Sequence, residues 1–321
     1  MSFICSSSGW AASSVSGLGI IIPPDKSSVE SSAISVVLNG WQTVVDEIEI
    51  SVNKHKQDVT AKKFERYDMC YDGIRLSYGM NNITIIGYKN GRKAHELTTR
   101  VFFRSDLAPL ANNAPDGFKQ YFFHTSEEEK KCSPCHELDF RKTGERQEGP
   151  DQSPCYVCHK KILSGYKFVH GPAAVWSCLM CHDGKSRNPK LVVISPISQF
   201  CANCHENSWD AKKYRHAPTA AGACTACHNP HAADKPYFLR MSAGDLCLSC
   251  HEEIPTRPHV VSSFSSERGH PLKNRPDPLK AGESLTCTSC HNPHGGNSSV
   301  FLNGYDEAKS MNFFCMSCHK W

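Results

Sequence analysis

Residues 224–231 read CTACHNPH, and residues 287–294 read CTSCHNPH. In each copy a histidine follows the second of two cysteines, and another histidine comes three residues later. The core of this element, C-x-x-C-H, occurs eight times in the 321-residue chain. These copies contain all but two of the 18 cysteines, the exceptions being Cys5 and Cys70. Whatever the eight copies bind must therefore dominate the fold of this region.

C-x-x-C-H is the attachment signature of c-type haem, in which two thioethers hold the porphyrin and the adjacent histidine becomes the proximal iron ligand. Zinc sites, disulfide frameworks and thioredoxin-like pairs give no reason for a histidine after every second cysteine. The sequence therefore predicts eight covalently attached haem c groups. The attaching residues are Cys132, Cys135, Cys155, Cys158, Cys178, Cys181, Cys201, Cys204, Cys224, Cys227, Cys247, Cys250, Cys287, Cys290, Cys315 and Cys318. The proximal ligands are His136, His159, His182, His205, His228, His251, His291 and His319.

The motifs are regularly spaced. Five successive intervals between first cysteines are 23 residues each, and the last two are 40 and 28 residues. His124, His170 and His216 each lie eight residues before the first cysteine of motifs one, three and five, so the true repeat is 46 residues long and carries two haems. His270 belongs to the same element in a fourth unit that an insertion has stretched. We therefore expect an array of four two-haem units over residues 124–321.

The second histidine of CTACHNPH needs its own explanation. Covalent attachment fixes His228 under its own iron, and His231 follows across the stiff Asn229-Pro230 step. His231 cannot reach the opposite face of the same porphyrin, so we interpret it as the distal ligand of a neighbouring haem. His294 would have the same role after His291.

Distal ligands can be counted from the histidines outside the motifs. Seven lie in the array: His124, His170, His216, His231, His259, His270 and His294. Eight irons therefore face seven local candidates. The eighth ligand is His55 or His95 from the N-terminal region, a methionine, or a histidine from another subunit, unless the position is vacant.

Residues 120–321 resemble the doubled C-x-x-C-H multihaem cytochromes. These are relatives of the cytochrome c3 type and of the long haem-chain cytochromes with which metal-reducing bacteria pass electrons across the outer membrane. His170-Gly171-Pro172 and His216-Ala217-Pro218 match the leading element of this pattern, and the two C-x-x-C-H-N-P-H copies match its centre. Motif three departs from it, reading CLMCHDG. The resemblance implies a relay of haems that have histidine on both faces.

Composition is consistent with an interior made of cofactors. The array has about 24 residues per haem, too few to bury an ordinary core around each one. We therefore expect short helices at the motifs, long loops and little sheet. The formal charge of +4 becomes about −12 once the haem propionates are included, which argues against nucleic-acid binding. No apolar run of 18 residues is present, so we expect no membrane span.

Residues 30–105 have a different pattern, with apolar residues alternating over short runs separated by turn signals such as Asn90-Gly91. This pattern predicts an all-β sandwich. The stretch from Leu76 to Ile83 resembles the L-x-x-G-x-N-x-I turn of bacterial immunoglobulin-like (Ig-like) modules. Residues 106–123 are read as a linker, and Cys70 as a buried thiol. The inward positions are Ile34, Val36, Leu38, Ile48, Ile50, Val52, Ile74, Leu76, Ile83, Ile85, Val101 and Phe103.

Haem attachment of this type occurs outside the bacterial cytoplasm, so export is expected, although residues 1–29 lack an ordinary secretory signal. The function predicted is electron transfer rather than catalysis, because no motif is altered in the way that multihaem reductases generally show. We expect an extracellular or outer-membrane site, with redox proteins or extracellular acceptors as partners and a homopolymeric filament as one possible form. The alternatives are a periplasmic or porin-associated carrier, and a reductase with one open haem.

Overall fold

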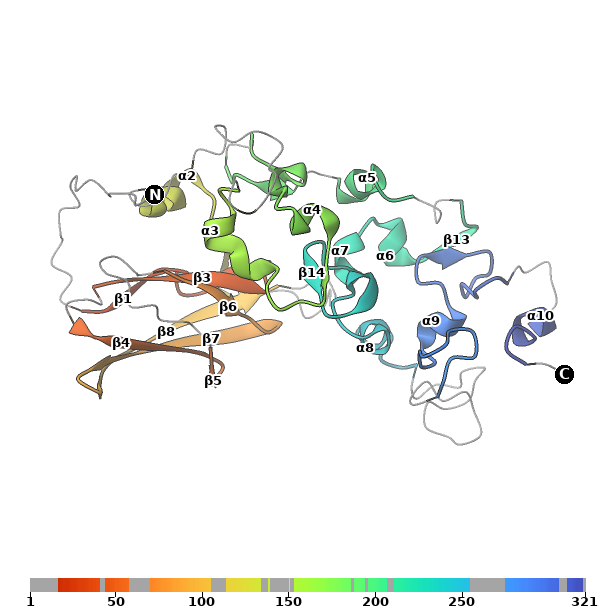
Figure 1. Ribbon diagram of the computed structural model, residues 1–321, viewed down its shortest axis with the longest axis horizontal. Helices are drawn as coiled ribbons and strands as arrows, with labels where there is room; N and C mark the ends of the chain where they lie inside the picture. The colour runs from red at the N-terminus through yellow and green to blue at the C-terminus, as the bar shows by residue number, and fades with distance from the viewer. Residues whose placement is uncertain are drawn as a thin grey trace. The chain divides into compact units, whose positions relative to one another are not determined.

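The computed structural model describes residues 17–40, 44–57, 70–104, 114–133, 138, 150, 153–185, 188–193, 196–206, 211–254, 275–305 and 311–319. It divides into two compact units. The first contains the N-terminal β domain together with the segments that carry motifs one to three, and the second contains the remaining motifs and residues 166–170. Figure 1 shows β-strands in the N-terminal part and short helices in the motif-bearing part.

The β domain consists of two sheets. The smaller is antiparallel, in the order β1 (Gly19–Ile22), β3 (Ala33–Asn39) and β6 (Cys70–Arg75). The larger has the order β5-β4-β7-β8-β2-β9. Its strands are β2 (Ser27–Val29), β4 (Glu47–Val52), β5 (His55–Lys56), β7 (Gly79–Lys89), β8 (Arg92–Phe103) and β9 (Lys119–Gln120). Strand β2 runs parallel to both β8 and β9, so the larger sheet is mixed.

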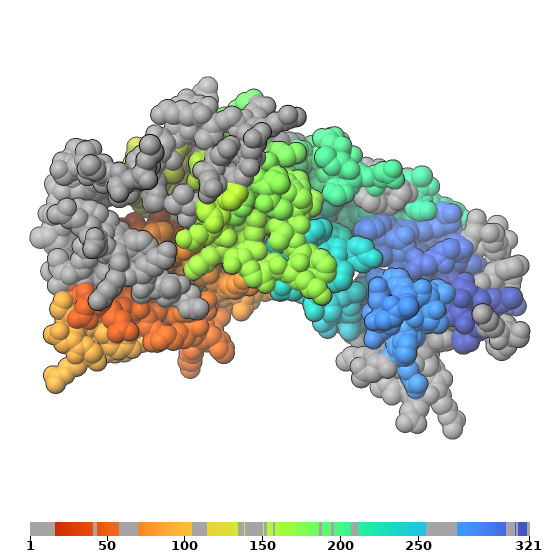
Figure 2. Space-filling model, viewed as in Figure 1, coloured from red at the N-terminus to blue at the C-terminus, as the bar shows by residue number. Residues whose placement is uncertain are grey.

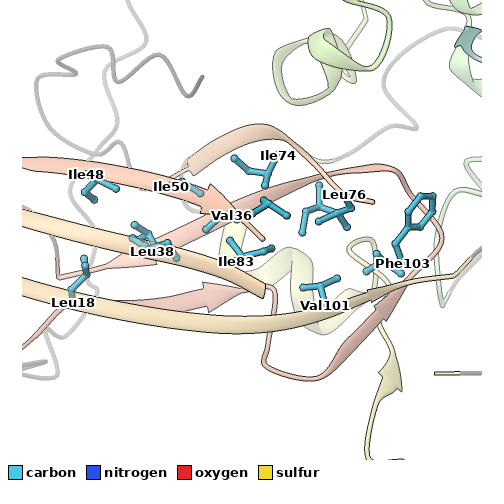
Figure 3. Close-up of a cluster of buried hydrophobic side chains, with 14 of the residues drawn as sticks. Leu18, Val36, Leu38, Ile48, Ile50, Ile74, Leu76, Ile83, Val101 and Phe103 are labelled. Carbon is cyan, nitrogen blue, oxygen red and sulfur yellow. The ribbon is translucent and has the colours of Figure 1, made fainter. Parts of the chain in front are cut away.

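The core of the β domain is formed by the residues that alternation predicts to point inward. All twelve are buried, and they belong to one cluster with Leu18, Val29 and Val45. Figure 3 shows their side chains gathered between the strands. The period of two explains this, because successive side chains of a strand point to opposite faces. The prediction of strands and of their inward positions is confirmed for these residues.

Two local features fix the register of the longest hairpin, β7–β8. Asn90 and Gly91 form its two-residue turn with φ values of 51° and 71°, which suits these two residues. At the other end, the fully buried Asn81 side chain accepts a hydrogen bond from the backbone N–H of Ser77 (2.9 Å) and donates to the carbonyls of Ser77 (2.7 Å) and Gly79 (2.9 Å). The amide of Asn81 therefore satisfies the backbone of the turn before β7.

The sheets extend beyond the range predicted from alternation. Strands β1 and β2 lie before residue 30. Alternation does not predict them, because GIII is a continuous apolar run and SSV is too short to show a period of two. Strand β9 lies within the segment read as a linker and pairs with β2. Cys70, in β6, is exposed as a residue, so the expectation of a buried thiol is wrong, although partial desolvation of its sulfur raises the pKa of this thiol to about 12.

The segment that carries motif two packs on the edge strand β6. Lys161 donates a hydrogen bond to the carbonyl of Asp72 (3.0 Å), and Arg75 donates to the carbonyl of Ser164 (3.3 Å). Gly73 has a φ of 70°, and a Cβ atom there would lie 2.3 Å from Cδ of Lys161, so a larger residue would be strained and would displace the Lys161 side chain. In Figure 2 the yellow-green surface of this segment adjoins the orange surface of the sheet.

The motif-bearing segments contain only short elements. Helices are α2 (Ser126–Cys132), α3 (Tyr156–His159), η3 (Lys160–Ile162), α4 (Gly171–Ala174), η4 (Cys178–Met180), α5 (Ile197–Ala202), α6 (Ala217–Ala220), α7 (Cys224–Cys227), η5 (Pro236–Phe238), α8 (Ala243–Leu248), α9 (Cys287–Cys290) and α10 (Met311–Cys315). Strands have two residues each: β10 (Phe168–Val169), β11 (His182–Asp183), β12 (Val192–Val193), β13 (Tyr214–Arg215), β14 (Ala232–Ala233) and β15 (Gly295–Gly296). These elements agree with the short helices and sparse sheet expected of a chain that relies on cofactors for its interior.

Candidate haem-binding sites

A single helical turn organises most of the described motifs. In motifs two, four, five, six, seven and eight, the backbone N–H of the motif histidine donates to the carbonyl of the first cysteine, at 2.9 to 3.1 Å. This bond spans four residues, so the two cysteines and the histidine follow one another around a single turn. The sequence C-x-x-C-H thus supplies two attachment points and a ligand from one rigid element.

Motif three differs in structure as well as in sequence. Its turn is the tighter η4, in which the N–H of Cys181 donates to the carbonyl of Cys178 (3.1 Å). The histidine that follows, His182, begins β11 and is succeeded by Asp183 and Gly184 in place of Asn-Pro-His. Motif three therefore lacks the element that supplies a second histidine in motifs five and seven.

In three odd-numbered motifs, the ring of the proximal histidine is oriented by a backbone carbonyl nine residues further on. Nδ1 of the ring lies 2.8 Å from the carbonyl of Leu191 for His182, 2.7 Å from that of Tyr237 for His228, and 2.6 Å from that of Val300 for His291. A carbonyl only accepts, so Nδ1 carries the proton and Nε2 is left as the metal-binding nitrogen. This contact fixes both the tautomer and the ring orientation.

Four motif histidines each lie close to a histidine that the sequence predicts to be a distal ligand. The distances between ring centres and the interplanar angles are 6.1 Å and 43° for His124 and His159, 5.9 Å and 23° for His170 and His205, 6.0 Å and 22° for His216 and His251, and 6.0 Å and 25° for His228 and His294.

These separations fit an iron ion between the rings. Metal–imidazole bonds are about 2 Å long and the ligating nitrogen lies about 1.1 Å from its ring centre, so two imidazoles on opposite sides of one ion have centres roughly 6 Å apart. The spacing of the four pairs would therefore allow one haem iron to bind between the two imidazoles of each pair.

Burial keeps several of these imidazoles in the form that binds metal. It lowers the pKa of His159 to about 4, and it lowers the pKa values of His216 and His294. The pKa of His124 is also lowered, because burial outweighs the opposing effect of Glu129. Each of these rings is thus neutral near neutral pH, as an iron ligand must be.

Two equivalent small sheets position His170 and His216, which the sequence predicts to be distal ligands. Strand β10 leads into His170 and pairs with β14, and β13 leads into His216 and pairs with β15. The N–H of His170 donates to the carbonyl of His231 (3.0 Å), and that of His216 to the carbonyl of His294 (3.4 Å). Each sheet therefore joins an H-x-P histidine to an HNPH histidine.

The asparagine of each HNPH element shapes the turn. The side-chain oxygen of Asn229 accepts a hydrogen bond from the backbone N–H of His231 at 3.0 Å. The side-chain oxygen of Asn292 accepts one from the backbone N–H of His294 at the same distance. Because the two HNPH elements have the same local structure, we expect the ring of His231 to be placed relative to its own turn as the ring of His294 is.

Phenylalanine edges contact two of the distal rings. Phe238 meets His170 at 5.5 Å between ring centres, and Phe301 meets His216 at 5.7 Å, both edge to face. Both phenylalanines have a positive φ, 56° and 58°, which is unusual for a bulky residue and persists where surrounding contacts enforce it. The repeat alone does not predict these contacts, since the aromatic residues lie outside the C-x-x-C-H pattern.

Consecutive motifs place their cysteines side by side. A hydrogen bond between the thiols of Cys155 and Cys178 lowers the pKa of Cys155 to about 7 and raises that of Cys178. A hydrogen bond between the thiols of Cys247 and Cys287 likewise lowers the pKa of Cys287 to about 7 and raises the pKa of Cys247. Burial, and then a thiol of the adjacent motif, raises the pKa values of Cys158 (beside Cys132), Cys227 (beside Cys250) and Cys290 (beside Cys318). Five of the seven steps along the array thus join neighbouring attachment points.

Other predicted site residues are placed differently. Cys135, His136, His259 and His270 lie outside the described residues. His55 is exposed in β5, and His95 lies in β8 opposite Gly87.

Comparisons with known proteins address the motif-bearing region. The family model for the doubled CXXCH motif matches residues 170–208, 216–256 and 277–321, less than half of the chain. The first two matches begin at His170 and His216, the leading histidines of their repeats. No curated protein matches.

Two solved structures have weak local likeness. One is an endo-beta-1,4-mannanase from Thermotoga petrophila, with a TM-score of 0.22, 10% identity, and coverage of 27% of this chain and 19% of that one. The other is described as a beta-galactosidase from Bacteroides fragilis, with a TM-score of 0.20, 12% identity, and coverage of 27% and 12%. The chain spans less than a fifth of either protein, and likeness at this level carries no argument.

The three doubled CXXCH matches indicate covalently bound haem c and support a multihaem c-type cytochrome, a class of protein that carries out electron transfer. Among the described residues, no helix is long and apolar enough to cross a membrane.

Proposed function

We propose that the chain is an octahaem cytochrome that relays electrons along a series of haems with histidine on both faces. The observation that carries this proposal is the set of four histidine pairs, each separated by the width of one iron and its two bonds. Haem, when bound, supplies reversible one-electron chemistry at its iron. The chain's task is to hold and orient the cofactors and to limit their access to water.

The pairs suggest two rules for ligand assignment. A histidine that lies eight residues before an odd-numbered motif pairs with the motif histidine 35 residues further on, in the next even-numbered motif, as His124, His170 and His216 do. An HNPH histidine pairs with the odd-numbered motif before its own, as His294 does with His228. By the first rule His270 would serve motif eight, across the stretched fourth unit.

The second rule indicates where a distal ligand is missing. Motif three reads CHDG, so it provides no histidine for the haem of motif one, and neither rule assigns a histidine to motif seven. These two haems then depend on ligands from elsewhere: His259, His55 or His95, a methionine, or a second subunit. A ligand from a second subunit would make the protein a polymer, and an open position would leave room for reductase activity.

Neighbouring attachment points favour a relay over isolated sites. The side-by-side cysteines of motifs two and three, and of motifs six and seven, belong to different haems, so consecutive cofactors are attached next to each other. A reductase needs one open haem, whereas a relay needs many close ones. The arrangement of the described motifs supports the relay.

We further propose that the protein is exported and acts at or beyond the outer membrane, with a periplasmic or porin-associated carrier as the alternative. The β domain, which we propose to be an Ig-like sandwich, would serve docking or assembly. Its packing on the motif-two segment, through Lys161 and Arg75, supports a fixed attachment to the start of the array.

The cofactor count provides a direct test. The mature protein, produced in a host that attaches haem c, should have a mass that exceeds the polypeptide by about eight haems, and reduced spectra should be low-spin. A count near six, with the described motifs loaded, would contradict the octahaem assignment. Native mass measurement across a range of concentrations tests polymerisation, since a monomer throughout would exclude a ligand supplied by a second subunit.

A further inference from the structure

The predicted distal ligand His124 has a carboxylate partner. Nδ1 of His124 lies 3.2 Å from Oε1 of Glu129, whose side chain is only 8% exposed. We propose that Glu129 is a positioning residue that lowers the reduction potential of the haem held by motif two, through its hydrogen bond to the distal ligand His124. This inference rests on the proposed bis-histidine ligation of that haem.

The carboxylate is held in place from two sides. Helix α2 begins at the Thr125 cap, whose hydroxyl accepts the N–H of Glu128 (3.1 Å), and this helix directs Glu129 back toward His124. The second carboxylate oxygen pairs with the ammonium group of Lys190. The backbone N–H of Lys190 in turn donates to the carbonyl of His124 (2.7 Å). Residues 124, 129 and 190 therefore form a closed set of contacts around one imidazole.

The equivalent histidines have no acid at the corresponding position, and the ring of His216 forms a hydrogen bond with the backbone of Pro293. The residue five positions after His170 is Val175, and the residue five positions after His216 is Ala221, so neither repeat has an acid at this place. Their rings meet the edges of Phe238 and Phe301. The rings of His124 and His159 are also the most tilted of the four pairs, at 43°. The first repeat is thus distinct in both charge and geometry.

The direction of the effect follows from electrostatics. Reduction adds one electron to the iron from an external donor and breaks no bond, so the oxidised state has one more positive charge next to the ligands. A carboxylate that accepts a hydrogen bond from Nδ1–H makes the imidazole a more basic ligand and adds negative charge nearby. Both effects stabilise the oxidised state of the iron. Lys190 offsets part of this charge through its ion pair with Glu129.

The consequence concerns the path of electrons. Motif two then holds a lower-potential haem than motifs four and six, whose distal ligands have no carboxylate at this position. Its segment is also the one that packs on the β domain. A potential difference between this end and the rest of the array favours electron movement away from motif two.

Potentiometric titration of the loaded full chain tests the inference. Glu129→Gln removes the negative charge. It should raise the midpoint potential of one component, which contributes about one eighth of the haem absorbance, by about 59 mV or more. At a fixed applied potential, the ratio of reduced to oxidised haem in that component then becomes at least tenfold higher. The control is Glu127→Gln, the same change at an exposed position of the same helix, which should leave every component in place.

The outcomes separate the inference from the proposed function. A full haem count with unchanged potentials overturns the role of Glu129 and leaves the octahaem relay standing, whereas a low count in the unaltered protein overturns the relay itself. If Glu129→Gln fails to load haem, Glu129→Asp decides, because it keeps the charge and withdraws the oxygen from Nδ1. An upward shift in that variant supports the inference, and an unchanged titration overturns it.

Discussion

Replacing His294 with alanine should open one haem to external ligands. The ring of His294 lies 6.0 Å from that of His228, so its loss should remove the proposed distal ligand of the haem expected at Cys224 and Cys227. The reduced variant should bind about one more carbon monoxide per chain than the unaltered protein and gain a high-spin absorption component. Optical titration of the dithionite-reduced protein with carbon monoxide measures both.

Two matched variants distinguish loss of a ligand from damage to the turn. His294→Met keeps a ligand on the iron and should stay low-spin, with a raised potential for one component. Asn292→Ala removes the side chain that accepts the His294 N–H but retains the imidazole, so carbon monoxide binding should stay near that of the unaltered protein. If His294→Ala binds no additional carbon monoxide, the assignment of His294 to motif five is wrong.

Much of the β domain could be predicted from sequence because its physics is local. A period of two determines which side chains point inward, and Asn-Gly determines the β7–β8 turn. Strands without a visible period were missed, β1 because all its residues are apolar and β9 because two residues show no pattern. Whether the sandwich is of the Ig-like type is a question of strand connection, which alternation does not determine.

The cofactor residues were equally visible, but their partners were not. His216 lies eight residues from Cys224, yet its ring faces His251, which belongs to the next motif. Sequence proximity misleads here because His228, the ligand of the nearer motif, faces His294 instead. Contacts made through the backbone, such as the carbonyl of Tyr237 on Nδ1 of His228, have no residue signature. Glu129 is likewise one of three consecutive glutamates, and only helix geometry selects it.

Two kinds of interior are thus joined in one chain. In the β domain, aliphatic side chains fill the space between sheets, and among the described residues the hydrophobic core cluster lies entirely within residues 18–103. In the motif-bearing segments, short turns present cysteine and histidine, and the porphyrins must supply apolar surface. Substitutions in the aliphatic core of the β domain should therefore reduce its stability without changing iron ligation. Substitutions such as His294→Ala should change iron ligation without reducing the stability of the β domain.

Replacing Ile83 with alanine should destabilise the β domain strongly. Ile83 is fully buried in β7, between the neighbours β4 and β8, so the truncated side chain leaves a cavity. Substitutions of this kind cost about 2–5 kcal/mol in the free energy of unfolding. Hydrogen exchange of peptides from β7 and β8 in the full, haem-loaded chain measures the change locally, and their protection should fall by a factor of about 30 or more.

Ile86→Ala is the matched control, since Ile86 belongs to the same strand but is only half-buried on the opposite face. Its effect should be well under that of Ile83→Ala. The haem spectrum should be low-spin in both variants, because none of the four histidine pairs includes a residue of β7. Loss of low-spin absorption in Ile83→Ala alone would instead show that the sandwich is required to hold the iron ligands, and that the two interiors depend on each other.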